Sequence, residues 1–306
     1  MHAPKLIATI AAMSKSKPLI GFVGQGYVGG TYANNFQKRG YKIVRYSLEE
    51  KYRGNKEKIK DCDLIFVCVP TPTTPKGFDF SIVEAGISLG RKGAIAVVKS
   101  TLLPGTTNKL QKKFPGIRVL CSPEFLSVAT AQKDADNPFS NIVGIPRDTK
   151  EYKKAAALVH SVLPNAGFSL TCMSVEAELI KYAHNISGYM QVLTFNLIYD
   201  LAKKIGADWA PIEKAVRADP LIPNRYASPL HKSGRGAGGA CFIKDMAAFA
   251  RLYRQVVGRN EGVALLAAAQ KNNIALLTKT KKDLKLLSDV YGAAVVHKRS
   301  VKKRAR

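Results

Sequence analysis

A glycine turn near the start of the chain constrains the fold more than any other feature of the sequence. The stretch "GFVGQGYVGG" places Gly24, Gly26 and Gly29 between an apolar segment and a helical pattern. In this spacing the first glycine permits a tight turn, the second lets a pyrophosphate approach the backbone, and the third lets the helix pack on the strand. The N–H groups at the helix start then bind the phosphates. The turn therefore predicts a βαβ unit that binds a dinucleotide, the alternative being a purely structural turn.

Strand patterns alternate with helical ones over the first half of the chain. After the strand that precedes the glycine turn, we predict strands within 41–47, 62–73, 94–101, 117–125 and 141–146. This alternation implies a parallel sheet with helices on both faces, the Rossmann arrangement. From 174 onward the pattern is helical, and its first helix, of about 30 residues, is long enough to link two domains or form a dimer core. We therefore predict an α/β domain followed by an all-helical one.

The predicted boundaries divide the chain into four parts. They are a leader at 1–17 that we expect to be disordered, a dinucleotide-binding domain at 18–172, a helical dimerisation domain at 173–290 and a basic tail at 291–306. Within the helical part, 261–287 has a continuous amphipathic pattern.

Charge and cysteine content narrow the class of protein. The net charge of +26 is spread over the whole chain and attracts nucleotides and phosphosugars as well as nucleic acids. No nucleic-acid motif accompanies it, so we do not expect specific nucleic-acid binding. No apolar run approaches the roughly 20 residues of a membrane helix, so we expect no membrane association. Five cysteines without a CxxC pair suit a reducing compartment, which predicts a cytoplasmic protein without a metal site.

The end of the second predicted strand bears on the choice of dinucleotide. NAD-binding folds of this type carry an acid there, which binds the adenosine ribose. This chain has Ser47 instead, with Arg45, Lys51 and Arg53 nearby. A hydroxyl among cations also suits the 2′-phosphate of NADP, so the residues leave NAD and NADP open.

Two further patterns place polar residues where such folds carry out chemistry. Lys181 and Asn185 lie four residues apart on one helix face, so both donors can point at one oxygen on which charge develops. Glu124 and Thr101 follow predicted strands, whose carboxyl ends face the ligand crevice. Glu124 is therefore a candidate for proton transfer. The alternatives are a solvated lysine with a surface amide, and a helix-capping or surface glutamate.

A cysteine stands directly after a run of glycines in "GRGAGGACFIKDMAAFA". This is Cys241, at the predicted start of a helix, where the helix dipole favours a thiolate. Lys244 adds a cation nearby, and Asp245 follows one turn on. The glycines leave room for a substrate to reach the backbone. The environment fits a nucleophile better than the alternative, an inert buried thiol.

Together these residues resemble the UDP-glucose/GDP-mannose dehydrogenase family of nucleotide-sugar dehydrogenases. The matching stretches follow the family's order over most of 18–255: "GQGYVG", "VPTPT", "KSTLLPGTT", "SPEFL", "AELIKYAHN" and "GGACFIKD". The resemblance implies a Rossmann domain followed by an all-α domain similar to that of 6-phosphogluconate dehydrogenase. It also implies NAD as cofactor, a nucleotide-sugar substrate such as UDP-glucose, and a homodimer. The implied reaction is a four-electron oxidation of the sugar C6 hydroxyl, through a thiohemiacetal and a thioester on a cysteine.

The resemblance also implies a role for each matching residue. The catalytic roles fall on Cys241 as nucleophile, on Lys181 and Asn185 for the oxyanion, on Asp245 for proton transfer or water positioning, and on Glu124 and Thr101 for water positioning and activation. The cofactor contacts fall on Gly24, Gly26, Tyr27, Val28, Gly29, Ser47, Thr71, Thr101 and Lys244. The substrate contacts fall on Glu124, Phe125, Leu126, Lys181, Asn185, Lys232, Gly238 and Gly239.

The chain departs from the family pattern at several points. Ser47 replaces the strand-end acid, "PEFLSVA" replaces the usual Arg-Glu-Gly continuation, and Ile243 stands where proline is common. Full-length members carry a further α/β domain, and because this chain ends at Arg306 we expect a truncated form without it. Two alternatives follow from these departures. One is a two-domain β-hydroxyacid dehydrogenase with a single hydride transfer and no need for the cysteine, and the other is a non-catalytic nucleotide- or polyanion-binding protein.

Overall fold

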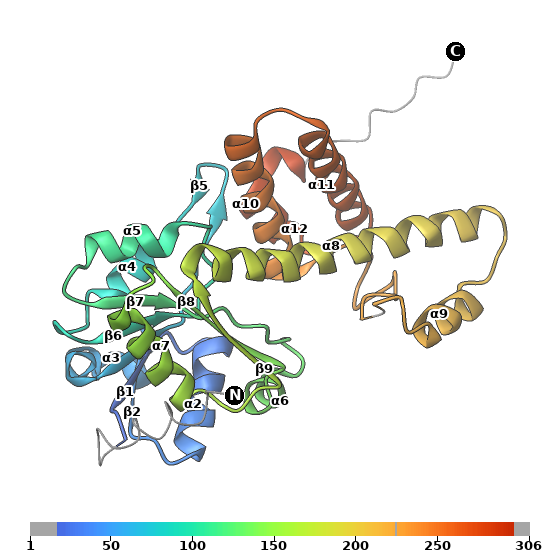
Figure 1. The fold of residues 1–306 in the computed structure, drawn as a ribbon. Helices are drawn as coiled ribbons and strands as arrows, with labels where there is room; N and C mark the ends of the chain where they lie inside the picture. The colour runs from blue at the N-terminus through green and yellow to red at the C-terminus, as the bar shows by residue number, and fades with distance from the viewer. Residues whose placement is uncertain (1–16, 224, 297–306) are drawn as a thin grey trace. The chain divides into compact units, whose positions relative to one another are not determined.

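The computed structural model describes residues 17–223 and 225–296 (Figure 1). The predicted leader, up to residue 16, and the tail from 297 onward lie outside the described residues. The chain divides into two compact units. The first consists of 1–71 with 80–179, and the second of 72–79 with 180–306. Each unit is described below by itself.

The first unit contains a sheet of seven strands within the described residues, in the order β2-β1-β3-β6-β7-β8-β9. The strands are β1 (Ile20–Val23), β2 (Ile43–Tyr46), β3 (Leu64–Val67), β6 (Ile95–Val98), β7 (Arg118–Cys121), β8 (Ser140–Ile145) and β9 (Phe168–Met173). The helices of this unit are α2 (Tyr27–Lys38), α3 (Glu50–Arg53), α4 (Ser81–Ile87), α5 (Thr106–Lys113), α6 (Ala131–Asp136) and α7 (Lys150–Val162), with a 3₁₀ turn, η1 (Lys56–Asp61). A Rossmann-type α/β fold is therefore confirmed.

The central strands are buried along their whole length. Every residue of β1, β3 and β6 is buried, which explains why these strands are continuous apolar runs rather than alternating ones. Beneath α2, the rings of Phe22, Phe36 and Phe66 pack with centroids 5.1–5.3 Å apart. This aromatic cluster fixes the helix that follows the glycine turn against the sheet.

The far edge of the sheet differs from the prediction. The pairs from β2 through β7 are parallel, but β8 pairs with β7 in the antiparallel direction, at Cys121 and Gly144. Strand β9, which the sequence analysis did not predict, runs parallel to β8. The side chains of β9 are mostly exposed or half-buried, so the strand lacks the apolar run that marked the others.

The second unit is built mainly from helices (Figure 1). They are α8 (Ser174–Lys204), whose first residues belong to the first unit, and α9 (Trp209–Ala218), α10 (Gly239–Val257), α11 (Glu261–Lys279) and α12 (Leu284–Tyr291), followed by the 3₁₀ turn η2 (Ala293–Val295). The predicted long helix is thus present, with 31 residues. Two apolar clusters hold α10 and α11 together, one around Met246 and one around Leu277. None of the described helices is long and apolar enough to cross a membrane.

Two features of the second unit were not predicted. The continuous pattern over 261–287 is broken between α11 and α12, where Lys281 and Asp283 have φ angles of 55° and 53°. A short hairpin, β4 (Thr73–Thr74) and β5 (Gly77–Phe78), comes from the predicted proline-rich loop and packs on α10 and α12. Arg251 of α10 anchors it by donating twice to the carbonyl of Thr74, at 3.2 Å.

Candidate active site

The glycine turn lies at the carboxyl end of β1, where α2 begins. Gly24 has a φ of +91°, and a side chain there would overlap the carbonyl of Cys68. A Cβ on Gly29 would overlap the carbonyl of Gly24, so α2 can approach β1 only with glycine at this position. A Cβ on Gly26 would meet no atom within 4 Å, and Gly26 caps α2 without a side-chain hydrogen bond. The first N–H groups of α2 are therefore available to a pyrophosphate.

The two residues after Gly26 begin the helix. Tyr27, the first residue of α2, is 41% exposed. Val28 is half-buried and packs against the core of the first unit. Tyr27 thus has its ring at the surface of the turn, where a bound dinucleotide would lie.

The residues at the end of β2 bear on the choice between NAD and NADP. The Ser47 hydroxyl accepts a hydrogen bond from the backbone N–H of Glu49 at 3.3 Å. The Arg45 guanidinium donates to Asn34 and Gln37, at 2.9 and 2.8 Å. Arg53 likewise donates to the carbonyl of Leu48. Arg45 and Arg53, two of the three cations near Ser47, thus donate to neutral oxygens of the protein, while Lys51 is exposed.

Buried polar groups collect where β3, β6 and β7 end. Glu124 is 5% exposed, and its Oε2 atom accepts from the N–H of Leu126 at 2.7 Å. Its charge adds to the effect of burial in raising the pKa of Tyr32. Thr71 is also buried and Thr101 is half-buried. Glu124, Thr71 and Thr101 thus follow neighbouring parallel strands at one edge of the sheet, as predicted for a ligand crevice.

The sequence analysis missed a buried lysine at this edge. Lys99 is 3% exposed, and its Nζ donates to the carbonyl and hydroxyl oxygens of Ser122 at 3.0 and 3.1 Å. The ammonium also lies 4.5 Å from the centroid of the Tyr32 ring. A lysine directly after a buried apolar strand was the signal that could have identified it.

Phe125, a predicted substrate residue, lies beside Phe139 with ring centroids 5.2 Å apart.

The second unit brings together a pair of polar residues from α8 and α10. Asn185 donates through Nδ2 to Oδ2 of Asp245 at 2.6 Å. Lys244 donates to the other carboxylate oxygen at 2.5 Å. Asp245 is 1% exposed, so this carboxylate is buried between an amide and an ammonium. Lys244, for which a cofactor contact was predicted, forms an ion pair with Asp245.

Lys181 and Cys241 are placed by the same two helices. Lys181 lies one turn before Asn185 on α8 and is buried. Cys241 is half-buried at the third position of α10, one turn before Asp245. The residues at i and i+4 share a helix face. The second unit therefore carries the predicted thiol, amide, ammonium and carboxylate on two helices that are joined by a hydrogen bond.

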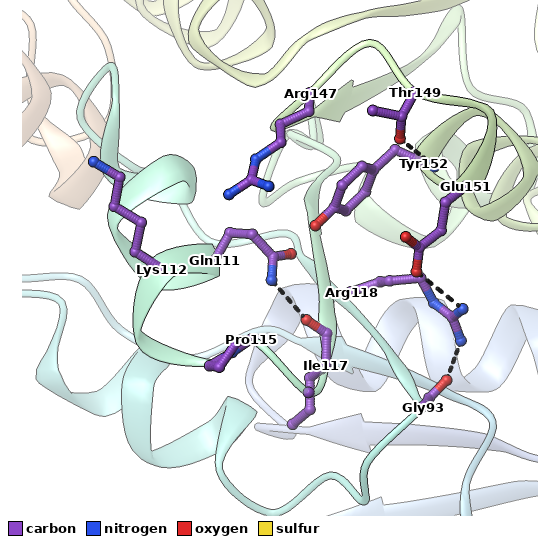
Figure 2. Close-up of a pocket in the computed structure, with 11 residues that line it drawn as sticks. Gly93, Gln111, Lys112, Pro115, Ile117, Arg118, Arg147, Thr149, Glu151 and Tyr152 are labelled. Carbon is purple, nitrogen blue, oxygen red and sulfur yellow. Dashed lines mark hydrogen bonds and ion pairs between the residues drawn. The ribbon is translucent and has the colours of Figure 1, made fainter.

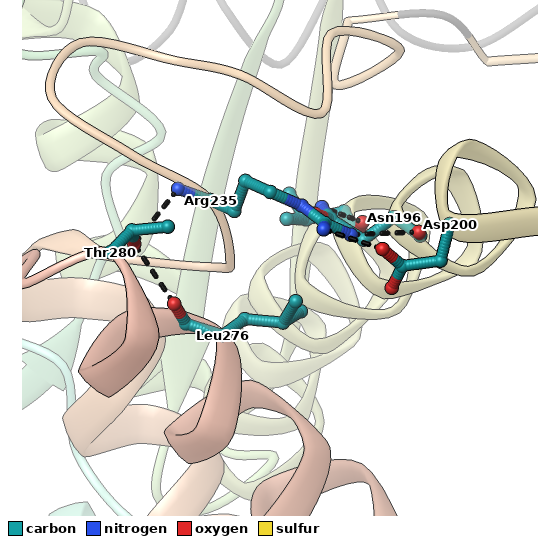
Figure 3. Close-up of polar contacts among 6 residues, drawn as sticks. Asn196, Asp200, Arg235, Leu276 and Thr280 are labelled. Atoms are coloured by element: carbon teal, nitrogen blue, oxygen red, sulfur yellow. Dashed lines mark hydrogen bonds and ion pairs between the residues drawn. The ribbon is translucent and has the colours of Figure 1, made fainter. Parts of the chain in front are cut away.

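The loop before α10 is held tightly by its own unit (Figure 3). The Arg235 guanidinium donates to Oδ1 and the carbonyl of Asn196 and to Oδ1 of Asp200, at 2.8, 3.0 and 2.6 Å. The Arg235 N–H donates to the hydroxyl of Thr280. Asn273 exchanges two hydrogen bonds with the backbone of Ala237. Arg235 thus ties the loop to α8, while Asn273 of α11 and Thr280 directly after α11 hold the backbone of the loop.

The three predicted substrate residues of this loop differ in their surroundings. Lys232 is exposed, with a φ of 54°. Gly238 caps α10. The N–H of Gly239, however, donates to Oδ2 of Asp283 at 2.8 Å, so the protein already uses that donor. Asp283 also puts a negative charge at the helix end that carries Cys241, which opposes the preference of the helix dipole for a thiolate.

The remaining described cysteines have environments that suppress reactivity. Burial raises the pKa of Cys62 and of Cys68 to about 12, and that of Cys172 to about 11. Burial also raises the pKa of Cys121. At neutral pH these thiols are protonated, and a protonated thiol is a poor nucleophile. Cys241 stands at a helix N-terminus instead.

Two family models match the chain. Residues 48–162 match the NAD binding domain of the UDP-glucose/GDP-mannose dehydrogenase family, and residues 175–274 match the central domain of the same family. The glycine turn precedes the first matched range. The first unit thus corresponds to an NAD-binding domain, and the cofactor it indicates is NAD.

Known proteins are similar over most of the chain. A UDP-glucose 6-dehydrogenase from Haloferax volcanii is 27% identical over 279 residues, which are 75% of this chain and 64% of that protein. The chain thus spans less than two-thirds of the length of this relative. Among solved structures, a UDP-glucose dehydrogenase from Pyrobaculum islandicum matches with a TM-score of 0.73 and 24% identity, over 92% of this chain and 72% of the other. The 3-hydroxyisobutyrate dehydrogenase of Mycobacterium tuberculosis matches with a TM-score of 0.65 and 15% identity, over 92% and 99%.

Proposed function

Because the chain belongs to the UDP-glucose/GDP-mannose dehydrogenase family, we propose that it is an NAD-dependent nucleotide-sugar 6-dehydrogenase, with UDP-glucose as its substrate and UDP-glucuronate as its product. The observation that carries the proposal is the joining of Asn185 to Asp245 one helical turn from Cys241. An oxidation from alcohol to acid needs a nucleophile that holds the aldehyde, and a thiol at this position meets that need. Relatives named UDP-glucose 6-dehydrogenase support the choice of sugar.

The glycine turn and its helix fit the cofactor. The open backbone at Gly26 and the uncapped start of α2 would hold the pyrophosphate, and Ser47 would lie near the ribose. Two NAD molecules bound there in succession would each supply the acceptor for one of the two hydrides. Glu124, which is buried after β7, is the candidate for accepting the hydroxyl proton, directly or through water.

The proposed oxidation takes place in two stages. The alcohol carbon first loses a hydride and its hydroxyl oxygen loses a proton, which gives the aldehyde. The sulfur of Cys241 then adds to the carbonyl carbon while the thiol proton passes to the carbonyl oxygen, which forms a thiohemiacetal. Lys181 and Asn185 donate to the oxygen on which negative charge develops. Loss of a second hydride and the hydroxyl proton leaves a thioester. Water then attacks the thioester carbon, releasing the acid and the thiol, and Asp245 orients that water or takes its proton.

We further propose that the protein is a cytoplasmic homodimer. None of the five cysteines, which all lie in the described part of the chain, forms a disulfide, and this suits a reducing compartment. Leu197 and Leu201 in the last turns of α8 and Ile205 directly after it follow one another at intervals of four residues, and these residues are 55, 61 and 69% exposed. A contiguous apolar stripe of this kind is typical of an interface with another subunit. A second copy of α8 would cover it.

Counting reduced cofactor per sugar tests the proposed reaction. Purified protein is incubated with a panel of UDP- and GDP-sugars and with NAD or NADP, and the reduced cofactor and the acid product are both measured. We expect two NADH per UDP-glucose, with Cys241→Ser stopping before acid release. One NADH per substrate, unaffected by Cys241→Ser, would instead identify a β-hydroxyacid-type dehydrogenase. No turnover with any sugar would leave a non-catalytic nucleotide-binding protein.

A further inference from the structure

A cavity lies in the first unit, away from the glycine turn (Figure 2). Its volume is about 450 Å³. Gly93 and Arg118, which line it, stand at the amino ends of β6 and β7. Gly24 follows the carboxyl end of β1, and β1, β3, β6 and β7 run parallel in register. The cavity therefore lies at the amino ends of these parallel strands, and the glycine turn lies at their carboxyl ends.

The reversed strand β8 completes this cavity. Because β8 is antiparallel to β7, its carboxyl end reaches the edge at which β7 begins. The chain leaves β8 through Arg147 and enters α7, whose N-cap is Thr149. Both residues line the cavity. If β8 were parallel to β7, Arg147 would lie near the carboxyl end of β7, away from the cavity.

The lining is strongly positive. The lining contains three cationic side chains, those of Lys112, Arg118 and Arg147, and one carboxylate, that of Glu151. Glu151 lies 3.5 Å from Arg118, at Oε1 and Nη1. Arg118 also donates to the carbonyl of Gly93, but its Nε is buried without a hydrogen-bond partner. Among the described residues no carboxylate pairs with Lys112 or Arg147.

A tyrosine hydroxyl also points into the cavity. Tyr152 is 8% exposed, and its hydroxyl has no hydrogen-bond partner within the part of the chain that the structure describes. Figure 2 shows this hydroxyl directed toward the Arg147 guanidinium and the Gln111 amide, whereas the Arg118 guanidinium is turned toward Glu151 and Gly93. An unpartnered hydroxyl at a cavity wall, beside a guanidinium that pairs with no described carboxylate, indicates a position for a ligand oxygen. Gln111, in contrast, uses its amide on the backbone of Ile117 and Val119.

We propose that this cavity binds a phosphorylated small molecule, whose phosphoryl group is held by the guanidinium of Arg147 and the hydroxyl of Tyr152. Guanidinium groups match the geometry of a phosphoryl group and carry the charge that a dianion requires. The volume lies in the range of small-molecule pockets and exceeds what a phosphate ion alone fills. The site is independent of the proposed dehydrogenase activity, because it uses none of the residues assigned to that reaction.

Calorimetric titration of the full chain tests the site. The probes are inorganic phosphate and glucose 1-phosphate, added with saturating NAD so that the glycine turn is occupied. We expect dissociation constants of about 1 mM or below for the wild type. Arg147→Gln should weaken binding about tenfold and Tyr152→Phe about fivefold, since each removes one donor to the phosphoryl group. Lys154→Gln removes a charge from the exposed face of α7 outside the cavity and should change binding less than twofold.

Comparison of the two probes shows whether the cavity binds an organic phosphate or an inorganic oxyanion. Tighter binding of glucose 1-phosphate means that the organic part fills the rest of the cavity, and equal binding means that the oxyanion itself is the ligand. Arg147 is exposed and Tyr152→Phe preserves the ring, so NAD binding should be unchanged in both variants and serves as the folding control. The proposal is overturned if neither probe binds, or if Arg147→Gln and Tyr152→Phe bind both probes as the wild type does.

Discussion

Asn185 of α8 and Asp245 of α10 are joined by a hydrogen bond of 2.6 Å, and both side chains are buried. The bond fixes which end of the Asn185 amide faces the carboxylate. It also ties the helix that carries Cys241 to the helix that carries Lys181. Because Lys244 neutralises the same carboxylate, the charge of Asp245 is tolerated in a buried position. The proposed catalytic groups are thus placed by one short polar chain.

Replacement of Asp245 by Asn tests whether Asp245 and Asn185 act as a pair in the reaction. Asp245→Asn keeps one acceptor oxygen where the carboxylate has two, so Asn185 and Lys244 can no longer both be satisfied, and we expect turnover to fall about 100-fold. The loss should not add fully to that of Asn185→Ala, since both variants perturb the same hydrogen-bonded pair. Initial rates of NADH formation for both single variants and the double variant give the coupling. Additive losses would show that the two residues act separately.

The anchoring of the loop by Arg235 should affect substrate binding. Arg235→Lys cannot reproduce the fork that reaches both Asn196 and Asp200, and we expect a cost of about 1–3 kcal/mol in loop stability. The Michaelis constant should rise more than turnover falls, because the loop carries the proposed substrate residues. Arg259→Lys, at an exposed position, is the matched control. Equal kinetics for the two variants would exclude a role for the anchor.

Removal of the charge of Asp283 should activate the thiol. The Asp283 carboxylate bonds the first N–H of α10, two residues before Cys241. Asp283→Asn keeps a side chain that tolerates the observed φ of 53°, but it removes the negative charge. We therefore expect alkylation of Cys241 by iodoacetamide at pH 7 to become about threefold faster.

Peptide mass spectrometry identifies which thiol reacts in that experiment. The wild type should be labelled first at Cys241, because burial raises the pKa of Cys62 and Cys68 to about 12. Cys241→Ser should lose the fast phase of labelling. A fast phase that persists in Cys241→Ser, or an unchanged rate in Asp283→Asn, would contradict the interpretation.

Glu178 should make stability depend on pH. Its carboxylate accepts from the N–H groups of Gly105 and Thr107 at 2.6 and 2.7 Å, yet burial raises its pKa above the ordinary 4.5. The folded state then binds the proton more tightly than the unfolded state. The stabilisation that protonation gives is therefore present below pH 4.5 and is lost as the pH rises through the folded pKa.

Urea denaturation between pH 4 and 7 measures this effect. The difference in the free energy of unfolding between the wild type and Glu178→Gln should shift against the wild type as the pH rises, because glutamine does not titrate. Glu50→Gln, at an exposed position, should give a difference that does not depend on pH. A difference for Glu178→Gln that is constant with pH would show that its carboxyl has an ordinary pKa.

The exposed stripe on α8 should control the oligomeric state. Leu201→Lys places a charge at the centre of the stripe formed by Leu197, Leu201 and Ile205, which should weaken a dimer by about 2–3 kcal/mol. Sedimentation velocity over a range of concentrations measures the shift toward monomer. Leu230→Lys, at another exposed apolar position, is the control. A wild type that is monomeric at all concentrations would exclude this interface.

Local patterns in the sequence were sufficient for the features that short stretches of chain encode. The glycine turn, the buried strands and the 31-residue helix each depend on neighbours a few residues apart, through backbone sterics and hydrophobic periodicity. The spacing of Lys181 and Asn185 on one helix face was likewise readable, as was the place of Cys241 at a helix start. These residues could therefore be named before the fold was known.

Only the tertiary structure decided the features that join distant segments. The direction of β8, the break between α11 and α12 and the packing of the β4–β5 hairpin on α10 depend on which surfaces meet, and no local pattern encodes that. The same holds for the partners of Asp245, Arg235 and Asp283, which lie tens of residues away in sequence. The glycine run before Cys241 looked like an open substrate loop in the sequence, but the folded chain holds it through the carboxylate, amide and hydroxyl groups of three other helices.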